Sequence, residues 1–399
     1  MTRHLVISTD GHAGLPPGGY REYLDPQYRE RFDVALELQL AAARESRKQM
    51  LVEEINAKWR IGHEQELTGA WDHDQRIKVL DDDGIAAEVL FCDGITENNS
   101  PPFGAGIGLS PIGADHELQW AGARSHNRWL SEFVQMAPER RVGVAIVPAT
   151  WDVDEAVAEV RWCRQRGLSS VQIPCVWGDH APYHHPKYDA LWAVCQELDV
   201  VVNFHSGAAD SAQYFGNVPG SGQPPLLGGM GIYCCEAVWV VARPLTFLIW
   251  GGVFERYPDL KVAITEATAS WAPHYMQHWD ERYLDWHVTA KLGDYKSHLS
   301  MKPSDYFHRN VKLGTFLARK EIEQRDEVGT ECMMWGSDYP HPEGTWPQTD
   351  EMMLDAFRGI PEADTTAILG GTAATFYGFD VEKLAPLAGR IGPEKKRFQ

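Results

Sequence analysis

Carboxylate and imidazole side chains follow short apolar runs in this sequence, at spacings that suit a metal ion. The first pair is Asp10-Gly-His12, which comes soon after the apolar residues 5–7. Side chains two residues apart lie on the same face of an extended strand, so Asp10 and His12 can reach one point in space. A carboxylate oxygen and an imidazole nitrogen suit zinc, manganese or ferrous iron. An Asp-x-His pair alone is a weak signal, so the hypothesis of a metal site depends on matching ligands elsewhere.

Matching residues stand just past three later apolar runs. These residues are His205, Glu266, Asp338 and His341. Three carboxylates buried together without a cation would have raised pKa values and would cost several kcal/mol. One divalent ion leaves the set of five residues with a charge of about −1, and two ions leave it at about +1. We therefore predict one or two zinc, manganese or iron ions, with metal ligands at Asp10, His12, His205, Asp338 and Glu266. For Glu266 the alternative is hydrogen bonding to nearby backbone amides.

The elements that carry these residues alternate between strand and helix. Strands are expected at residues 5–7, 86–91, 142–147, 170–173, 200–204, 261–265, 310–313 and 333–336. Helices are expected at 32–59, 74–84, 114–137, 152–166, 187–198, 233–256, 271–289 and 319–327, with further helices near 352 and 366. Alternation of this kind implies a parallel sheet, and eight units imply a closed (β/α)8 TIM barrel, with its active site at the C-terminal ends of the strands. An open doubly wound sheet is the alternative, but no Gly-x-Gly-x-x-Gly follows the first strand.

We expect one barrel domain over residues 1–399, because no break in composition divides the strand–helix units. A helical insertion is expected at about 13–73, after the first strand. A Gly/Pro-rich segment at about 206–231, after the fifth strand, is too long for a plain connection and is expected to be a lid loop.

Composition limits the partners and the compartment. The net charge of −19 argues against nucleic acid and anionic membranes. The seven cysteines form no Cys-x-x-Cys, which favours reduced thiols and a cytoplasmic location. The start shows no signal-peptide pattern, and the apolar segment 237–254, broken by Pro244, is predicted to be a buried helix. We expect a small-molecule substrate and a homodimer.

Four motifs resemble the amidohydrolase superfamily, and more narrowly its amidohydrolase-related (family 2) branch. They are Asp10-Gly-His12, His205-Ser-Gly, Gly-Val-Phe-Glu-Arg-Tyr-Pro-Asp-Leu-Lys at 252–261, and Gly-Ser-Asp-Tyr-Pro-His at 336–341. This branch includes the aminocarboxymuconate-semialdehyde and resorcylate-type decarboxylases, and the resemblance runs from about residue 4 to 380. It implies a metal-dependent barrel hydrolase or lyase with ligands at Asp10, His12, His205 and Asp338, in which Asp338 doubles as the acid/base.

One position departs from the decarboxylases of that branch. On the sixth strand, where they carry a catalytic histidine, this sequence has Glu266. The difference counts against decarboxylation, and it offers a further carboxylate for a second ion.

The first functional hypothesis is therefore that a metal-activated water hydrolyses a small organic substrate, of which aromatic and polycyclic compounds are examples. A bound divalent ion lowers the pKa of its water from 15.7 to about 7. Asp338 would accept the proton and return it to the leaving group, while Glu266 binds a second ion or orients the water. His341 would polarise the substrate or hydrogen-bond to Asp338.

Three other functions, two enzymatic and one not, are compatible with the same residues. One alternative is a nonoxidative decarboxylase of an aromatic or enoic acid, in which Asp338 or Glu266 protonates the carbon. Another is a nonheme iron or di-iron oxygenase, because a set rich in carboxylates and histidines also suits Fe(II). The third alternative is a barrel without catalytic activity that only binds a ligand, and the intact set of metal ligands argues against it.

Overall fold

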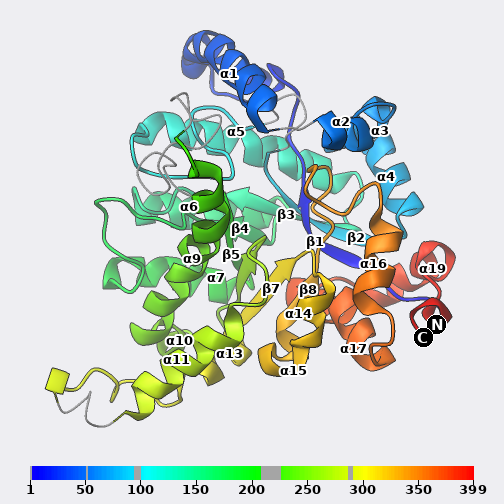
Figure 1. Ribbon diagram of the computed structural model, residues 1–399. Helices are drawn as coiled ribbons and strands as arrows, with labels where there is room; N and C mark the ends of the chain where they lie inside the picture. Colours follow the sequence, from blue (N-terminus) through cyan, green and yellow to red (C-terminus); the bar gives the residue numbers. More distant parts are fainter. Residues whose placement is uncertain (1, 51–52, 94–99, 208–225, 286–290) are drawn as a thin grey trace.

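The computed structural model describes residues 2–50, 53–93, 100–207, 226–285 and 291–399. Eight parallel strands follow one another around the molecule in the order β1 to β8, with helices outside them (Figure 1). The strands are β1 (Ile7–His12), β2 (Ala87–Phe91), β3 (Arg141–Ile146), β4 (Ser170–Gln172), β5 (Val201–His205), β6 (Val262–Thr265), β7 (Val311–Thr315) and β8 (Met333–Trp335). The predicted (β/α)8 barrel is confirmed.

The barrel closes between its first and last strands. A parallel bridge joins Gly11 to Tyr339, and the backbone N–H of Asp338 donates to the carbonyl of Asp10 at 2.7 Å. Gly336 permits this approach, because a Cβ at that position would lie 2.4 Å from the Cβ of Asp10. Closure therefore places the polar residues after β8 directly against those of β1.

The helices before β7 are α1 (Arg29–Met50), α2 (Glu53–Trp59), α3 (Glu64–Leu67), α4 (His73–Asp82), α5 (His116–Gln135), α6 (Val153–Gln165), α7 (Asp189–Glu197), α9 (Gly229–Trp250), α10 (Val253–Arg256), α11 (Ala272–Leu284) and α13 (Pro303–Asn310). The later ones are α14 (Arg319–Glu323), α15 (Arg325–Val328), α16 (Thr349–Phe357), α17 (Glu362–Thr366), α18 (Thr372–Tyr377) and α19 (Val381–Ile391). Aspartate side chains at 72, 115 and 152 cap α4, α5 and α6 by accepting from the amide three residues later. The sequence pattern missed α13, α18 and α19.

The helical segment expected after the first strand is present as α1 to α3, and α1 projects from the top of the barrel in Figure 1. Most of the predicted lid loop, residues 208–225, lies outside the described residues, as do the end of the predicted helix 271–289 and the junction between α1 and α2.

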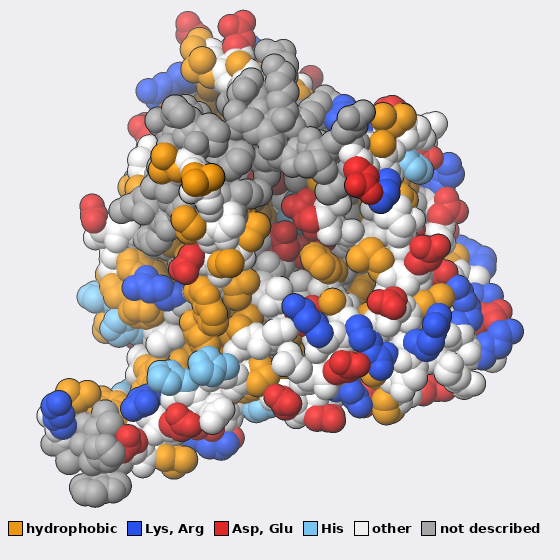
Figure 2. Space-filling model, in the orientation of Figure 1, with side chains coloured by type: hydrophobic (Ala, Val, Ile, Leu, Met, Phe, Trp, Pro, Cys, Tyr) orange, Lys and Arg blue, Asp and Glu red, His pale blue; other side chains and the backbone are white. Residues whose placement is uncertain are grey.

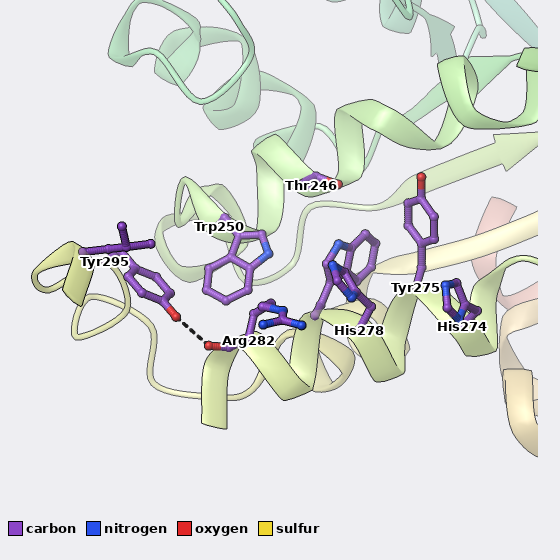
Figure 3. Close-up of a pocket in the computed structure, with 9 residues that line it drawn as sticks. Thr246, Trp250, His274, Tyr275, His278, Arg282 and Tyr295 are labelled. Carbon is purple, nitrogen blue, oxygen red and sulfur yellow. Dashed lines mark hydrogen bonds between the residues drawn. The ribbon is translucent and has the colours of Figure 1, made fainter. Parts of the chain in front are cut away.

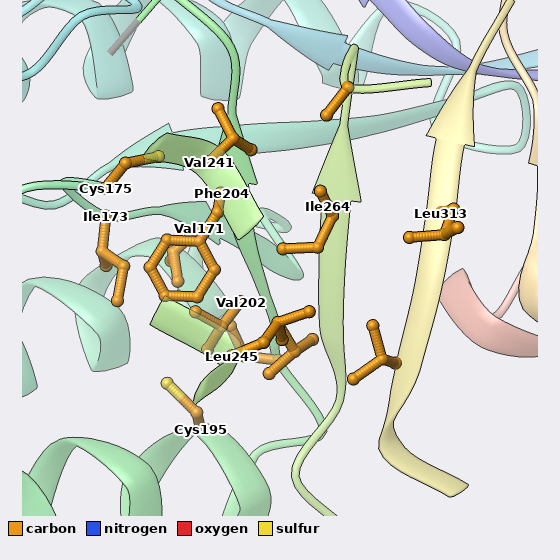
Figure 4. Packing of buried hydrophobic residues seen from close by; sticks show 14 of the residues in the cluster. Val171, Ile173, Cys175, Cys195, Val202, Phe204, Val241, Leu245, Ile264 and Leu313 are labelled. Carbon is orange, nitrogen blue, oxygen red and sulfur yellow. The ribbon is translucent and has the colours of Figure 1, made fainter. Parts of the chain in front are cut away.

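The largest apolar cluster lies between the strands and the outer helices. Figure 4 shows one part of it, which includes Phe204 of β5, Ile264 of β6, Leu313 of β7 and Leu245 of α9. Each of these four side chains is no more than 1% exposed. Strands of a barrel are covered on both faces, so they are apolar along most of their length, and polar residues are tolerated only near their ends.

Helix α9 is only partly the buried helix that the sequence predicted. Its second half packs into the core, where Val241 and Leu248 are buried, but Ile232 and Trp239 in its first half are 47% and 38% exposed. Figure 2 shows hydrophobic side chains over this region. The stretch Gly231–Trp250 is long and apolar enough to cross a membrane by length and composition, but core helices of soluble proteins share both properties, so this is weak evidence for a span.

The carboxyl group of Asp83, at the end of α4, is expected to make the free energy of unfolding depend on pH. Burial, followed by the charges of Asp82 and Asp350, raises the pKa of Asp83 to about 7, although the Thr349 hydroxyl donates to it at 2.6 Å. Between about pH 4 and pH 7 the folded protein holds a proton that the unfolded chain has released, so this group lowers stability as pH rises. Asp83→Asn should therefore raise the free energy of unfolding at pH 8 relative to the wild type by about 2 kcal/mol, and by much less at pH 4.

Urea unfolding of the wild type and the variant at the two pH values tests this prediction. Asp82→Asn, at an exposed neighbouring position, is the matched control and should show a much smaller pH-dependent gain. An Asp83→Asn gain that is equal at both pH values would contradict it.

Candidate metal centre

The predicted ligands meet at the C-terminal end of the strands, which we call the mouth. Asp10 and His12 lie within β1, since that strand extends to His12, and not just past the strand as the sequence predicted. His205 is the last residue of β5, and Glu266 directly follows β6. Asp338 follows β8 by three residues. The five residues thus come from four strands, of which β5 and β6 are neighbours and β8 adjoins β1 where the barrel closes.

Two groups of side chains form around His12. On one side, the Asp10 Oδ1 atom lies 3.3 Å from His205 Nε2 and 3.5 Å from His12 Nε2. On the other side, the Asp338 Oδ1 atom lies 3.3 Å from His12 Nε2 and 2.9 Å from His341 Nδ1. Asp10, His12, His205 and Asp338 are fully buried, and His341 is nearly so.

Backbone carbonyls orient the two strand histidines. The Nδ1 atom of His12 lies 2.7 Å from the carbonyl oxygen of Cys92, and that of His205 lies 3.1 Å from the carbonyl of Ser206. When Nδ1 carries the proton and donates it to the carbonyl, Nε2 presents its lone pair to the mouth. Metal-binding histidines are commonly held in this way.

Six buried polar atoms of the mouth make no hydrogen bond of acceptable geometry, even though Asp338 Oδ1 lies 3.3 Å from His12 Nε2 and 2.9 Å from His341 Nδ1. They are Asp10 Oδ2, His12 Nε2, both carboxylate oxygens of Asp338 and both ring nitrogens of His341. Buried polar atoms without partners cost free energy, and they are rare in folded proteins. A divalent cation would satisfy this set of oxygen and nitrogen donors, so the residues present fit a metal ion.

The charges of the mouth act on one another. Burial alone would raise the pKa of Asp338, but His341 and His12 offset it and hold that pKa below its usual range. Burial raises the pKa of Glu266 well above its usual value, and the Asp338 and Asp10 charges add to this effect. Crowding of carboxylates therefore opposes ionisation of Glu266 until positive charge enters the mouth.

Glu266 is held toward this cluster. Its Oε2 atom accepts a hydrogen bond from the Ser206 hydroxyl at 2.6 Å and lies 3.4 Å from His205 Nδ1. Among the described hydrogen bonds, none joins it to the backbone amides that were its alternative partners. Glu266 and Asp338 both adopt the left-handed backbone region, with φ of 53° and 58°. That conformation costs free energy for residues other than glycine, and such outliers concentrate at functional sites.

One donor was missed in the sequence. Glu343 has a carboxylate oxygen that lies within 4.8 Å of ligand atoms of Glu266, Asp338 and His341. It is more exposed than the others and stands at the rim of the mouth. The sequence could have suggested Glu343, because it stands two residues after His341 and before a glycine. The loop that follows the last strand had already supplied two site residues. Figure 2 shows acidic side chains gathered at a hollow near the middle of the face.

A separate cavity of about 840 Å³ lies outside this site, between α9, α11 and the segment that follows α11 (Figure 3). Trp250, Tyr275 and Trp279 supply aromatic walls, and His274 and His278 line the α11 side. None of its lining residues belongs to the mouth.

The comparisons with known proteins agree with this geometry. The amidohydrolase family model (Amidohydro_2) matches residues 103–379. The chain belongs to this amidohydrolase family. That membership confirms the resemblance found in the sequence, and it makes the protein an enzyme of a metal-dependent superfamily.

The relatives of this chain include decarboxylases. A 2-amino-3-carboxymuconate-6-semialdehyde decarboxylase from Dictyostelium discoideum is 24% identical over 324 residues, which is 79% of each chain. Among solved structures, an amidohydrolase from Mycobacterium avium subsp. paratuberculosis has a TM-score of 0.68 at 18% identity, covering 94% of this chain and 99% of that one.

A 5-carboxyvanillate decarboxylase from Novosphingobium aromaticivorans, solved with manganese and 4-hydroxy-3-methoxy-5-nitrobenzoic acid, has a TM-score of 0.65 at 18% identity. It covers 94% of this chain and 97% of that one. These likenesses show the barrel fold, and manganese in a related barrel accords with a divalent ion for this family member.

Proposed function

We propose that this amidohydrolase-family enzyme is a metal-dependent carboxy-lyase, which removes a carboxylate as carbon dioxide from a small aromatic or enoic acid without oxidation. The observation that carries this proposal is the similarity to a decarboxylase across 79% of both chains, joined to the buried cluster of donors at the mouth. The order of the hypotheses drawn from the sequence is thereby reversed, because hydrolysis has no specific support among the relatives.

The metal would be held by Asp10, His12, His205 and Asp338. When bound, a divalent ion supplies a Lewis acid that fixes an anionic oxygen of the substrate and draws electron density from the reacting carbon. The buried walls around these residues exclude water, which strengthens each charged contact within the mouth.

The protein's own part in the reaction is to bind the acid and deliver a proton. The bond between the carboxylate and its carbon breaks, its electron pair stays on the carbon, carbon dioxide leaves, and the carbon takes up one proton. Asp338 is ionised at rest, so it would relay a proton and not store one: it is buried, and His341 Nδ1 lies 2.9 Å from one of its oxygens, where it could pass the proton on. Glu266, held by Ser206 at 2.6 Å, has a carboxylate oxygen within 4.8 Å of ligand atoms of Asp338 and His341.

An assay with paired substrates tests the proposal. Manganese-loaded enzyme is incubated in D2O with 2,6-dihydroxybenzoate, with 5-carboxyvanillate and with the methyl ester of each. We expect carbon dioxide from at least one acid, with one deuterium at the vacated carbon of the product, and no reaction of the esters. Hydrolysis of the esters with both acids left unchanged would contradict the proposal and restore hydrolysis to first place.

Glu266→Gln should lower kcat about 100-fold, because an amide can neither transfer a proton nor supply negative charge to a cation, although it keeps the hydrogen bond from Ser206. Steady-state kinetics and elemental analysis are measured together. Glu351→Gln, at an exposed position on α16, is the matched control and should retain full activity. A Glu266→Gln variant with full activity and full metal content would show that Glu266 is only part of the scaffold.

A second candidate function follows from the second group of donors. Glu266, Asp338, His341 and Glu343 lie beside Asp10, His12 and His205, and this arrangement offers places for two ions. Donors rich in carboxylates suit Fe(II), so an iron-dependent oxygenase is the alternative. Protein purified without added metal should then contain two irons per chain and consume dioxygen with substrate. One ion per chain and no dioxygen uptake would support the lyase.

A further inference from the structure

A histidine, a glutamate and a cysteine converge at the end of the barrel opposite the mouth. His308 lies in the last turn of α13, and Glu331 and Cys332 lie in the 3₁₀ turn η5 (Thr330–Cys332). These two segments lead directly into β7 and β8. The three residues are therefore at the N-terminal ends of strands, whereas the mouth is at the C-terminal ends.

The three donor atoms form a small triangle. His308 Nδ1 lies 2.9 Å from Glu331 Oε1 and 3.5 Å from Cys332 Sγ, and that sulfur lies 3.8 Å from Glu331 Oε1. Tetrahedral zinc, with bonds of about 2.0–2.3 Å to nitrogen, oxygen and sulfur, separates its ligand atoms by roughly 3.3–3.6 Å. The observed separations average close to that range, so a zinc ion could enter with shifts of a few tenths of an ångström.

We propose that His308, Glu331 and Cys332 form a zinc-binding site, with water as the fourth ligand. A thiolate and an imidazole select zinc and similar transition ions over calcium or magnesium, which prefer oxygen donors. The Cys332 side chain is buried, while the side chains of His308 and Glu331 are 38% and 63% exposed. Solvent therefore reaches the open side of the triangle and supplies both the entry path and the water.

The backbone is shaped to let these side chains meet. A Cβ on Gly329 would lie 2.7 Å from Glu331 Oε1 and 2.8 Å from His308 Cε1, and Gly329 has a φ of +93° that side chains rarely adopt. Glycine is therefore required where the two ligands approach each other.

One neighbouring cation affects the thiol. Lys312 Nζ lies 4.0 Å from Cys332 Sγ and is held by the backbone carbonyls of His308 and Val311. Burial raises the pKa of the Cys332 thiol to about 12, and the charge of Lys312 offsets part of this rise. A bound zinc ion would supply the remaining positive charge that the thiolate needs, and the Glu331 carboxylate would balance it. Binding releases the thiol proton to solvent.

Cobalt provides a direct test, because thiolate coordination to Co(II) produces a near-ultraviolet charge-transfer band that histidine and carboxylate ligands do not. Co(II) is titrated into manganese-loaded enzyme in which the exposed Cys234 and Cys235 are replaced with serine. We expect the band to appear, and we expect Cys332→Ser to abolish it while manganese content and activity remain. His308→Ala should weaken Co(II) binding at least tenfold. Zinc should raise the Tm of the parent protein, which is the manganese-loaded enzyme with serine at positions 234 and 235, but it should not raise the Tm of the Cys332→Ser and His308→Ala variants.

Two results would overturn the proposal. One is the absence of a charge-transfer band in the parent protein at saturating Co(II), and the other is an undiminished band in Cys332→Ser. If Cys332→Ser does not fold, the variants His308→Ala and Glu331→Gln test the proposal in its place. Both residues are partly exposed, so these variants should fold, and the loss of either ligand must reduce the affinity for Co(II). Cys163→Ser is the matched control, because this thiol is also buried beside a glutamate, with Glu159 Oε1 at 3.9 Å, and it should leave the band intact.

Discussion

Asp338→Asn is expected to reduce kcat by about 1000-fold, the largest effect on activity of any single change at the mouth. General acid–base catalysis by one positioned side chain contributes about 10²- to 10⁴-fold, and an asparagine cannot carry the transferred proton. The change conserves shape, so the substituted side chain still fits beside His12 and His341. It also removes one negative charge from the set that would hold the metal, so a weaker hold on the ion should accompany the loss of rate.

Measuring the variant at saturating manganese separates the two effects. If the rate remains about 1000-fold lower while one ion per chain is bound, proton transfer by Asp338 accounts for the loss. Asp364→Asn, which alters an aspartate paired with Arg325 away from the mouth, should keep full activity. An Asp338→Asn rate within tenfold of the wild type would rule out the assigned role.

Arg76→Met should lower the free energy of unfolding by about 3–5 kcal/mol, the largest expected effect on stability. Arg76 of α4 and Glu88 of β2 form a fully buried ion pair with Nη2–Oε2 at 2.8 Å, and a second contact joins Glu88 to Arg141 at 3.3 Å. Burial would raise the pKa of Glu88, but these arginines lower it and keep the carboxylate ionised. Removing Arg76 would leave that charge without its closest partner.

Urea unfolding of Arg76→Met, measured beside an exposed pair, tests the prediction. Arg256→Met breaks the partly exposed pair with Asp189 and should cost less than about 1 kcal/mol. Arg76 also donates to the carbonyl oxygen of His12 at 2.7 Å, so manganese affinity should fall as well. Equal losses in the two variants would contradict the assignment of Arg76 as a buried anchor of β1.

Much of the barrel could be predicted because strands in such a fold are short, apolar and ended by glycine, proline or polar residues. All eight strands were located, with boundaries shifted by a few residues. The end of β1 was misjudged, since Asp10 and His12 are polar residues inside a strand, and apolar runs alone cannot reveal that. The packing of α9 was also misjudged. An apolar sequence predicts a buried helix, but it does not show whether a neighbouring element covers the first half of that helix.

The candidate site was predicted in part, for a clear reason. Residues at strand ends could be gathered once the barrel was assumed, so Asp10, His12, His205, Glu266 and Asp338 were found together. Glu343 lies in a loop, and its approach to the mouth depends on the path of the chain after His341. The meeting of His308 with Glu331 and Cys332 depends on tertiary packing between two short turns, which no local pattern records.

The seam between Gly11 and Tyr339 has a consequence for synthesis of the protein. Asp10 leaves the ribosome well before its neighbour Asp338, because β2 to β8 lie between them along the chain. Contacts of such long sequence separation form late, because the entropy of closing the intervening chain must be overcome first. A chain that is truncated or stalled before Asp338 would therefore lack one of the metal ligands. Tight binding of the ion would be limited to molecules in which the barrel has closed.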